Sequence, residues 1–424
     1  MENSMEKVLI VGVELDNDEF EIEDSLDELE ELVKAAGGYV EARITQKKDR
    51  INAALFVGKG KAEEIRDYCE QLEIDTVVFN NELTGAQLRN LEEVIDRKII
   101  DRTTLILDIF ALRAASKEGK LQVKLAQMKY RLPRLIGMRD YLSREGAGIG
   151  TRGPGEQKLE TDRRHILREI NNIEKQLKEV ESIREVKRKK RISSNMPMVA
   201  MVGYTNAGKS TLTNTLMVHD NLDEDFKKVY VEDMLFATLD TSHRISKLPN
   251  GQEFLLSDTV GFVSKLPTKL VEAFKGTLEE VKYADLLLHV IDASNKDLDI
   301  QIKTTISILK DLDVIDKPII TIFNKMDKID IGNLMYDHKL IEDPIFISCK
   351  TGKNIDLLLD KIQEKLPQEF RQVKLLIPFD KQNLTNYFMN NYDVKNLQYI
   401  DTGTTMELTI DHVDFEKYKD YIIE

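Results

Sequence analysis

Hydrophobic positions in the first quarter of the chain alternate between short apolar runs and stretches of helical spacing. The runs predict strands at residues 8–13, 40–44 and 76–79, and the spacing predicts helices at residues 25–36, 61–71 and 85–95. Alternating strands and helices are typical of a small α/β domain. We therefore expect an N-terminal α/β domain over residues 1–110.

Residues 111–192 follow a different, seven-residue pattern. Apolar side chains step by three and four from residue 121 to 135, and the same frame returns from residue 159 to 180. Each stripe predicts one side of a coiled-coil seam, so we expect an antiparallel helical hairpin. Two ordinary bundle helices would share much of this pattern. Pro133 interrupts the first stripe and should kink or end that helix.

The expected connector of the hairpin, residues 137–155, is rich in glycine and arginine. Five of the 21 glycines of the chain lie within residues 146–155. Glycine permits close backbone approach to a partner, and arginine binds phosphate in a bidentate fork. We predict a tip that contacts RNA, although a flexible turn is the alternative. The predicted contact residues are Arg144, Gly148, Gly150, Arg152, Gly153 and Gly155.

Charge is distributed unevenly along the chain. The whole protein carries a net charge of −14, whereas residues 110–191 hold 22 Lys and Arg against 11 Asp and Glu. A basic segment in an acidic chain favours binding of a polyanion, and a solvated helical surface explains the charge equally well. The basic run at residues 187–191 is interpreted as a linker into the next domain.

A glycine-rich loop follows the predicted strand at residues 198–202. Its pattern, Gly-x-x-x-x-Gly-Lys-Ser, lies between a strand and a helix that we expect from Thr211. Backbone N–H groups of such a loop bind phosphate, Lys209 can reach the β- and γ-phosphates, and the Ser210 hydroxyl can ligate Mg²⁺. The predicted nucleotide contacts are Gly203, Tyr204, Thr205, Asn206, Ala207, Gly208, Lys209, Ser210 and Thr211.

Three further motifs follow predicted strands at residues 254–257, 318–323 and 345–348. They are Asp258-Thr259-Val260-Gly261, Asn324-Lys325-Met326-Asp327 and Ser348-Cys349-Lys350. Asp258 can hold Mg²⁺ and the Gly261 N–H can sense a γ-phosphate. Asp327 can accept two hydrogen bonds from guanine that adenine cannot donate. We predict a doubly wound α/β domain over residues 193–366 that binds GTP or GDP with Mg²⁺.

The predicted catalytic residues are Lys209, Thr238 and Gly261. Thr238 is our candidate for the switch-loop threonine that ligates Mg²⁺, with Thr241 as the alternative. Phe262 occupies the position where Ras-like GTPases often have a glutamine that orients the attacking water. Phenylalanine cannot orient water, so we expect slow hydrolysis or activation by a partner.

The rest of the chain limits the kinds of protein that the sequence can encode. Residues 367–424 contain expected strands at 373–379, 397–400 and 404–410 and a helix near 415–421, which predict a small C-terminal α/β domain. No apolar run approaches the roughly 18 residues of a membrane span, and the N-terminus lacks a signal-peptide stretch. Two cysteines exclude a disulfide scaffold or a cysteine-built zinc site. We expect a cytoplasmic protein.

The motifs together resemble those of the HflX family of translation-factor-class GTPases. The resemblance spans residues 8–366 and rests on the motifs that begin at Gly203, Phe236 and Asp258, on residues 150–164, and on residues 100–103 with 108–110. It implies a GTPase that binds the ribosome, chiefly the large subunit and its RNA, and splits stalled or idle ribosomes. It implies no DNA partner, and nothing in the sequence requires more than a monomer.

Two other functions remain open from the residues. A regulatory GTPase that acts on a protein or membrane partner would also use a coiled-coil hairpin. A module that binds nucleotide without turnover is the third alternative, and the intact Lys209, Ser210 and Asp258 argue against it.

Overall fold

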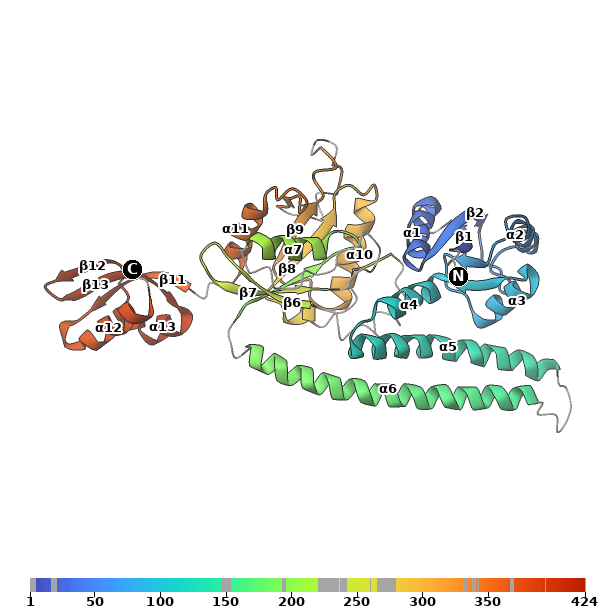
Figure 1. Cartoon of the computed structure of the whole chain (residues 1–424), viewed down its shortest axis with the longest axis horizontal. Helices are drawn as coiled ribbons and strands as arrows, with labels where there is room; N and C mark the ends of the chain where they lie inside the picture. Colours follow the sequence, from blue (N-terminus) through green and yellow to red (C-terminus); the bar gives the residue numbers. More distant parts are fainter. Residues whose placement is uncertain are drawn as a thin grey trace.

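The computed structural model describes residues 5–16, 21–145, 154–192, 196–219, 236, 242–259, 261–264, 280–330, 332, 334–337, 341, 343–366, 370–392 and 394–423. Three separate sheets follow one another along the molecule, and a long helical hairpin lies beside the first two (Figure 1). The multidomain α/β architecture expected from the sequence is confirmed.

The N-terminal domain is a parallel sheet covered on both faces. Its strands, in the order β2-β1-β3-β4, are β1 (Glu6–Leu15), β2 (Gly38–Lys48), β3 (Thr76–Phe79) and β4 (Lys98–Asp101). The helices are α1 (Ile22–Ala35), α2 (Lys59–Gln71), α3 (Gly85–Ile95) and α4 (Arg102–Arg113). One hydrophobic core lies under α1 and α4 and another under α2 and α3, as parallel sheets require.

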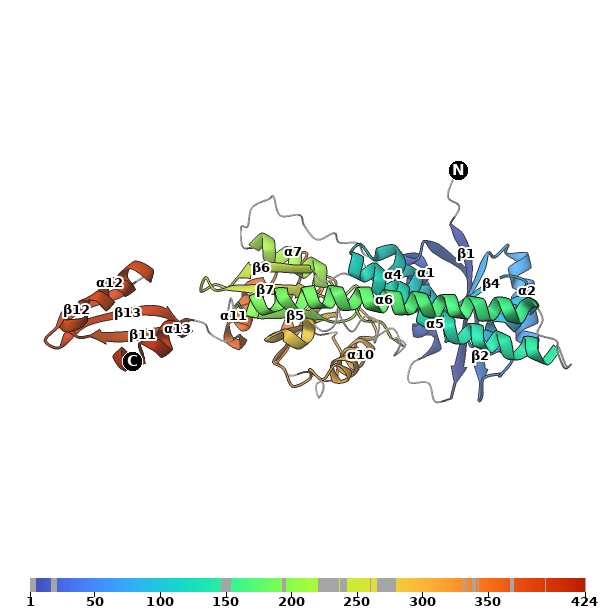
Figure 2. The same cartoon turned by 90° about the horizontal axis from the view of Figure 1, so that it is seen from below.

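The hairpin consists of α5 (Lys117–Glu145) and α6 (Pro154–Ile192), which run side by side in both views (Figures 1 and 2). Its seam confirms the heptad prediction. The apolar residues packed there are Leu121, Leu125, Met128, Leu132, Ile166, Ile170, Ile173 and Leu177. The 39 residues of α6 give it a length of about 58 Å, so it reaches from the N-terminal domain to the central domain.

Two expectations about the hairpin are wrong, and one of the two alternatives for Pro133 is excluded. Pro133 lies inside α5 without ending it, since the helix continues to Glu145. Its neighbours Tyr130 and Arg134 both bond to Asp101, which holds the helix in place across the missing backbone hydrogen bond. The connector is shorter than residues 137–155, since α5 and α6 include both of its ends. The basic run at 187–191 is part of α6 rather than a linker.

The central domain is a six-stranded mixed sheet in the order β10-β9-β8-β5-β7-β6, in which only β6 is antiparallel among the described pairs. Its strands are β5 (Met198–Val202), β6 (Ser242–Lys247), β7 (Glu253–Asp258), β8 (Leu286–Asp292), β9 (Ile319–Asn324) and β10 (Ile345–Phe346). Helices α7 (Lys209–His219) and α11 (Ile355–Lys365) cover one face, and α10 (Leu298–Asp311) covers the other.

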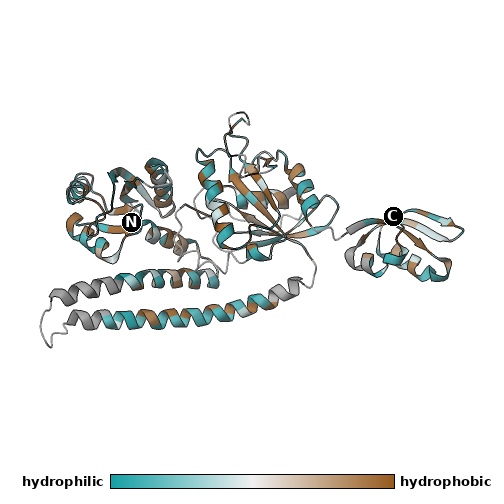
Figure 3. Ribbon diagram, turned by 180° about the vertical axis from the view of Figure 1, so that it is seen from behind, coloured by the Kyte–Doolittle hydropathy of each residue, from teal (hydrophilic) through white to brown (hydrophobic). Residues whose placement is uncertain are grey.

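The C-terminal domain is a three-stranded antiparallel sheet in the order β11-β13-β12. Its elements are β11 (Phe370–Ile377), α12 (Gln382–Asn391), β12 (Val394–Ile400), β13 (Gly403–Asp411) and α13 (His412–Lys417), with 3-10 turns at Phe379–Lys381 and Lys419–Tyr421. Helix α12 was not expected from the sequence. Hydrophobic residues concentrate in the three sheets, whereas α5 and α6 are largely hydrophilic (Figure 3). Within the described residues, no helix has the length and hydropathy to cross a membrane.

Candidate nucleotide site

The glycine-rich loop between β5 and α7 is shaped by two glycines whose backbone angles and close contacts disfavour any larger residue. Gly203 has φ +146°, and a Cβ there would lie 2.1 Å from the carbonyl oxygen of Val290 on β8. Gly208 has φ +94°, and its Cβ would lie 2.3 Å from the side-chain nitrogen of Asn324. The loop therefore packs directly against the ends of two neighbouring strands, which brings the first and third motifs together.

Lys209 begins α7 with a buried side chain. Its Nζ donates to the carbonyl oxygens of Gly203 (3.1 Å) and Tyr204 (2.7 Å), so the ammonium lies inside the curve of the loop. Burial lowers the pKa of Lys209 to about 8, against the opposing attraction of Asp258. A positive charge held in this position can bind the phosphates of a nucleotide.

Ser210 and Asp258 meet at the ends of α7 and β7. The Ser210 hydroxyl donates to Oδ2 of Asp258 at 2.7 Å. The other carboxylate oxygen, Oδ1, is buried and has no hydrogen-bond partner among the described residues. Burial also raises the pKa of Asp258, because the bond from Ser210 and the charge of Lys209 offset only part of the cost of burying a carboxylate. A hydroxyl and a free carboxylate oxygen fit Mg²⁺, which prefers oxygen ligands.

Gly261 lies against the same loop. A Cβ on Gly261 would lie 2.6 Å from the Cα of Thr205 and 3.1 Å from Nζ of Lys209. Phe262 continues this contact through its backbone, accepting a hydrogen bond from the Thr205 N–H at 2.7 Å and donating one to Gly203 at 3.1 Å. Its ring is buried in the core under α10. The Phe262 side chain therefore faces away from the nucleotide loop.

The two loops expected to bind the base are joined by hydrogen bonds. Asn324 donates to the carbonyl oxygen of Ala207 at 3.0 Å and accepts from the Cys349 N–H at 3.1 Å. The Ser348 hydroxyl donates to Oδ1 of Asp327 at 2.7 Å, and this bond lowers the pKa of Asp327. Asp327 is therefore held as a carboxylate at the edge of the sheet, the form that guanine recognition needs.

Family models match three consecutive parts of the chain. They are described as GTP-binding GTPase N-terminal (residues 23–111), GTP-binding GTPase Middle Region (113–191) and 50S ribosome-binding GTPase (198–325). The GTPase HflX of Caldanaerobacter subterraneus is 48% identical over 406 residues, which cover 95% of this chain and 91% of that protein. The chain belongs to the HflX GTPase family. It is therefore a GTP-hydrolysing enzyme.

Other comparisons cover a similar share of the chain. The GTPase HflX of Escherichia coli K12 is 38% identical over 385 residues, covering 90% of this chain and 88% of that protein. The crystal structure of an SsGBP and GDP complex is 27% identical and covers 85% of this chain and 98% of its own, with a TM-score of 0.46.

Several predicted site residues of this HflX-family protein lie outside the described part. They are Thr238, the fallback Thr241, Val260, Gly148, Gly150, Arg152 and Gly153. Arg144 and Gly155 lie in the last turn of α5 and the first turn of α6, rather than in a loop. Of the remaining predicted nucleotide contacts, Thr211 lies in the first turn of α7, and Lys325, Met326 and Lys350 lie in the loops that follow β9 and β10.

Sequence reasoning missed a polar network that joins the nucleotide loop to the N-terminal domain. The Tyr204 hydroxyl donates to Glu28 of α1. Glu28 also accepts from the Ser264 hydroxyl and, at 3.1 Å, from the Ser264 N–H. Arg102 of α4 completes the network through an ion pair with Glu28 at 2.7 Å. Burial and the neighbouring Glu28 raise the pKa of Tyr204, so its hydroxyl stays protonated.

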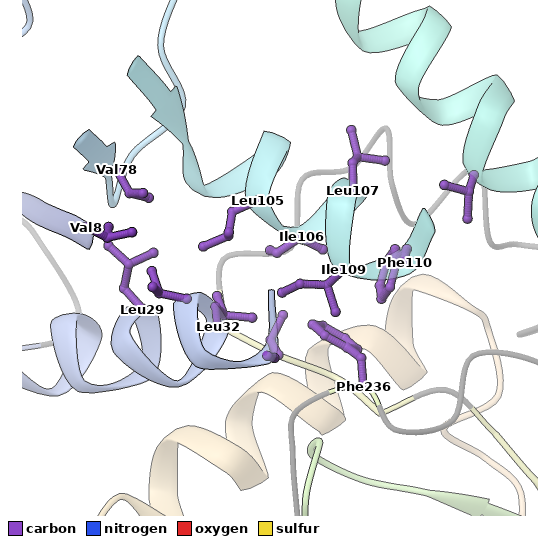
Figure 4. Close-up of a cluster of buried hydrophobic side chains, with 14 of the residues drawn as sticks. Val8, Leu29, Leu32, Val78, Leu105, Ile106, Leu107, Ile109, Phe110 and Phe236 are labelled. Atoms are coloured by element: carbon purple, nitrogen blue, oxygen red, sulfur yellow. The ribbon is translucent and has the colours of Figure 1, made fainter. Parts of the chain in front are cut away.

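An apolar contact accompanies this network. Tyr204, Phe236 and Val263 belong to the same hydrophobic cluster as the core under α1 and α4. In Figure 4, Phe236 lies beside Ile109 and Phe110 of α4. The rings of Phe236 and Phe110 cross edge to face with centroids 4.5 Å apart, and the Phe236 N–H donates to the Thr205 hydroxyl at 2.7 Å. Each of the three loops around the nucleotide site therefore contributes one side chain to the core of the N-terminal domain.

Proposed function

We propose that this GTPase binds the large ribosomal subunit in the cytoplasm and dissociates stalled or idle ribosomes. The basic hairpin carries the proposal. Lys and Arg outnumber Asp and Glu there by 22 to 11, so a surplus of positive charge remains even if every acidic side chain is paired. The family model described as a 50S ribosome-binding GTPase supports the ribosome as the polyanion. The tip between α5 and α6 would contact ribosomal RNA.

Within the nucleotide site, we propose roles that follow the observed contacts. Lys209 would bind the β- and γ-phosphates, the Gly261 N–H would sense the γ-phosphate, and Asp327 would select guanine. Ser210 and Asp258 would hold Mg²⁺, with Thr238 closing on it in the GTP state. The metal ion would neutralise charge that develops on the phosphate oxygens.

The orientation of Phe262 supports dependence on a partner. Its ring has no polar group and is buried under α10, so it cannot orient the water that attacks GTP. A group supplied from outside, or loops ordered by a partner, would then set the rate. We propose that the ribosome has this role.

The test measures GTP turnover with and without purified large subunits, at low and high salt. We expect strong stimulation that falls as salt rises, because contacts to phosphate release counterions. Deletion of residues 146–155 should abolish ribosome splitting and leave GTP affinity unchanged, and Lys209→Ala should lose both phosphate affinity and turnover. Absence of stimulation in a protein that binds GTP would reject the proposal in favour of a protein or membrane partner.

A further inference from the structure

The segment at residues 100–103 contains no predicted nucleotide contact, yet two of its side chains are buried and charged. Asp101 ends β4 and Arg102 begins α4. Asp101 is fully buried and Arg102 is 2% exposed. Charged side chains are rarely buried without specific partners, so the partners of these two neighbours show what the segment does.

Asp101 binds the hairpin. Its Oδ2 accepts from the Tyr130 hydroxyl at 2.5 Å and forms an ion pair with Arg134, both on α5. The same guanidinium donates to the carbonyl oxygen of Leu83 at 2.9 Å. The backbones of α3 and α5 are also in close contact here, because a Cβ on Gly85 would lie 2.7 Å from the Arg134 carbonyl oxygen. Helix α5 is thus fixed to the N-terminal domain at this point.

Arg102 binds residues that contact the nucleotide loop. Its Nη2 pairs with Glu28 at 2.7 Å and reaches the backbone oxygen and the hydroxyl of Ser264 at 3.3 and 3.2 Å. Ser264 follows Gly261 by three residues, and its N–H also donates to the Tyr204 hydroxyl at 2.6 Å. Arg102 therefore holds the chain just beyond Gly261 and is linked through Ser264 and Glu28 to Tyr204 of the phosphate-binding loop.

We propose that Asp101 and Arg102 couple the hairpin to the nucleotide site, with Arg102 as a positioning residue for GTP hydrolysis. A displacement of α5 moves Asp101, and consecutive Cα atoms are fixed 3.8 Å apart, so Arg102 moves with it. Both side chains are buried in packed surroundings that relax in steps rather than continuously. Because coupling free energies are reciprocal, the nucleotide state also changes the hairpin.

The proposal predicts a signal that needs no partner. Amide hydrogen exchange in the part of α5 around Tyr130 should differ between the GDP form and a form loaded with a non-hydrolysable GTP analogue. Tyr130→Phe removes only the hydroxyl bonded to Asp101, and Ser264→Ala removes only the hydroxyl that joins Arg102 and Glu28. We expect each variant to abolish the nucleotide-dependent difference. The control is Arg43→Gln, which removes an arginine paired with Asp27 and Glu30 on the solvent side of α1.

Steady-state kinetics give a second readout, which separates a defect in positioning groups for hydrolysis from a loss of folded protein. Ser264→Ala should lower kcat several-fold with little change in nucleotide affinity, and Tyr130→Phe should lower it too. In the double variant the effects on kcat should differ from the product of the single effects by a factor of about 3 or more. Multiplicative effects, or the same exchange difference in both variants as in wild type, would overturn the proposal. So would equal exchange of wild-type α5 in its two nucleotide forms. None of these outcomes depends on whether the ribosome is the partner.

Discussion

Lys209 and Asp258 are buried at the same site, and burial moves their pKa values in opposite directions. Each group disfavours its own charge in the folded protein, so each is prepared for a charged ligand: phosphate for the lysine and a cation for the carboxylate. The site is therefore electrostatically strained without ligand. Ligand binding should relieve this strain and take up or release protons.

The lowered pKa of Lys209 sets the direction of the first prediction, which concerns how GDP affinity changes with pH. In its proposed role the ammonium binds phosphate, and it loses its proton as pH rises through about 8. GDP affinity should therefore fall above about pH 8, by up to about tenfold per pH unit. Near pH 8 binding should take up about half a proton, because the phosphates raise the pKa of the bound lysine. Calorimetry in buffers of different ionisation enthalpy measures this uptake.

Lys209→Arg is the matched control, because its guanidinium stays charged throughout this range. Any loss of affinity shared by both proteins comes from ionisation of guanine. Identical pH profiles for wild type and Lys209→Arg, with no proton uptake, would contradict the assigned pKa.

Site residues that lie close together in the sequence could be predicted from the sequence alone. The loop that contains Gly208 and Lys209 needs fixed spacing, and a strand and helix on either side identify it. Ser264 and Glu28 had no such signal, because they lie 236 positions apart and meet only in the fold. Arg102 was visible as part of a family motif, although its partners were not.

At the level of elements, heptad spacing predicted the seam of α5 and α6 because coiled-coil packing depends on period alone. Pro133 does not end α5, and the bonds of Tyr130 and Arg134 to Asp101 hold the helix on both sides of it. Helix α12 was missed, because it is a short segment between strands and four of its ten residues are asparagine, which has a low helix propensity. Tertiary contacts decide such cases, and a single sequence does not contain them.

The close contact between Gly85 of α3 and Arg134 of α5 gives the second prediction. In Gly85→Ala the new Cβ would lie 2.7 Å from the backbone oxygen of Arg134, an atom that cannot rotate away. The two helices must separate, and we expect a loss of about 1–3 kcal/mol in the free energy of unfolding, measured with urea. Exchange protection in α5 near Arg134 should fall at the same time.

Gly60→Ala is the control for this substitution. Gly60 also lies in the first turn of a helix of the N-terminal domain, and nothing lies within 4 Å of its Cβ position. It should be neutral or stabilise by about 0.4–1 kcal/mol. Equal effects of the two substitutions would show that α5 does not press on Gly85.

At the scale of the whole molecule, the N-terminal and central domains share one core. Tyr204, Phe236 and Val263 fill the apolar surface of α1 and α4. The class of each sheet could be predicted from the order of strands and helices. Their mutual placement could not, because it depends on apolar side chains whose partners lie in another part of the chain.

Phe110 gives the third prediction, since its ring joins the two domains. Phe110→Ala should lower stability by about 3–5 kcal/mol. In wild type, GDP should raise the unfolding temperature of both domains together, because a ligand stabilises the whole cooperative unit that it binds. In Phe110→Ala, GDP should protect only the central domain. Scanning calorimetry with and without GDP measures both transitions.

Phe79→Ala is the matched control, because Phe79 is buried in the core on the other face of the same sheet. It should destabilise the N-terminal domain comparably while GDP still protects both domains. Joint protection by GDP in Phe110→Ala would show that the shared core does not unite the domains.

The shared core also has a consequence for biosynthesis. Glu28 and the apolar surface of α1 leave the ribosome 236 residues before Ser264 does. At about 5–20 residues per second, that interval lasts roughly 10–50 s. Throughout it, the nascent N-terminal domain exposes the apolar surface that Tyr204, Phe236 and Val263 later cover. We therefore expect a nascent chain of this protein to bind chaperones that recognise apolar surfaces close to the exit tunnel.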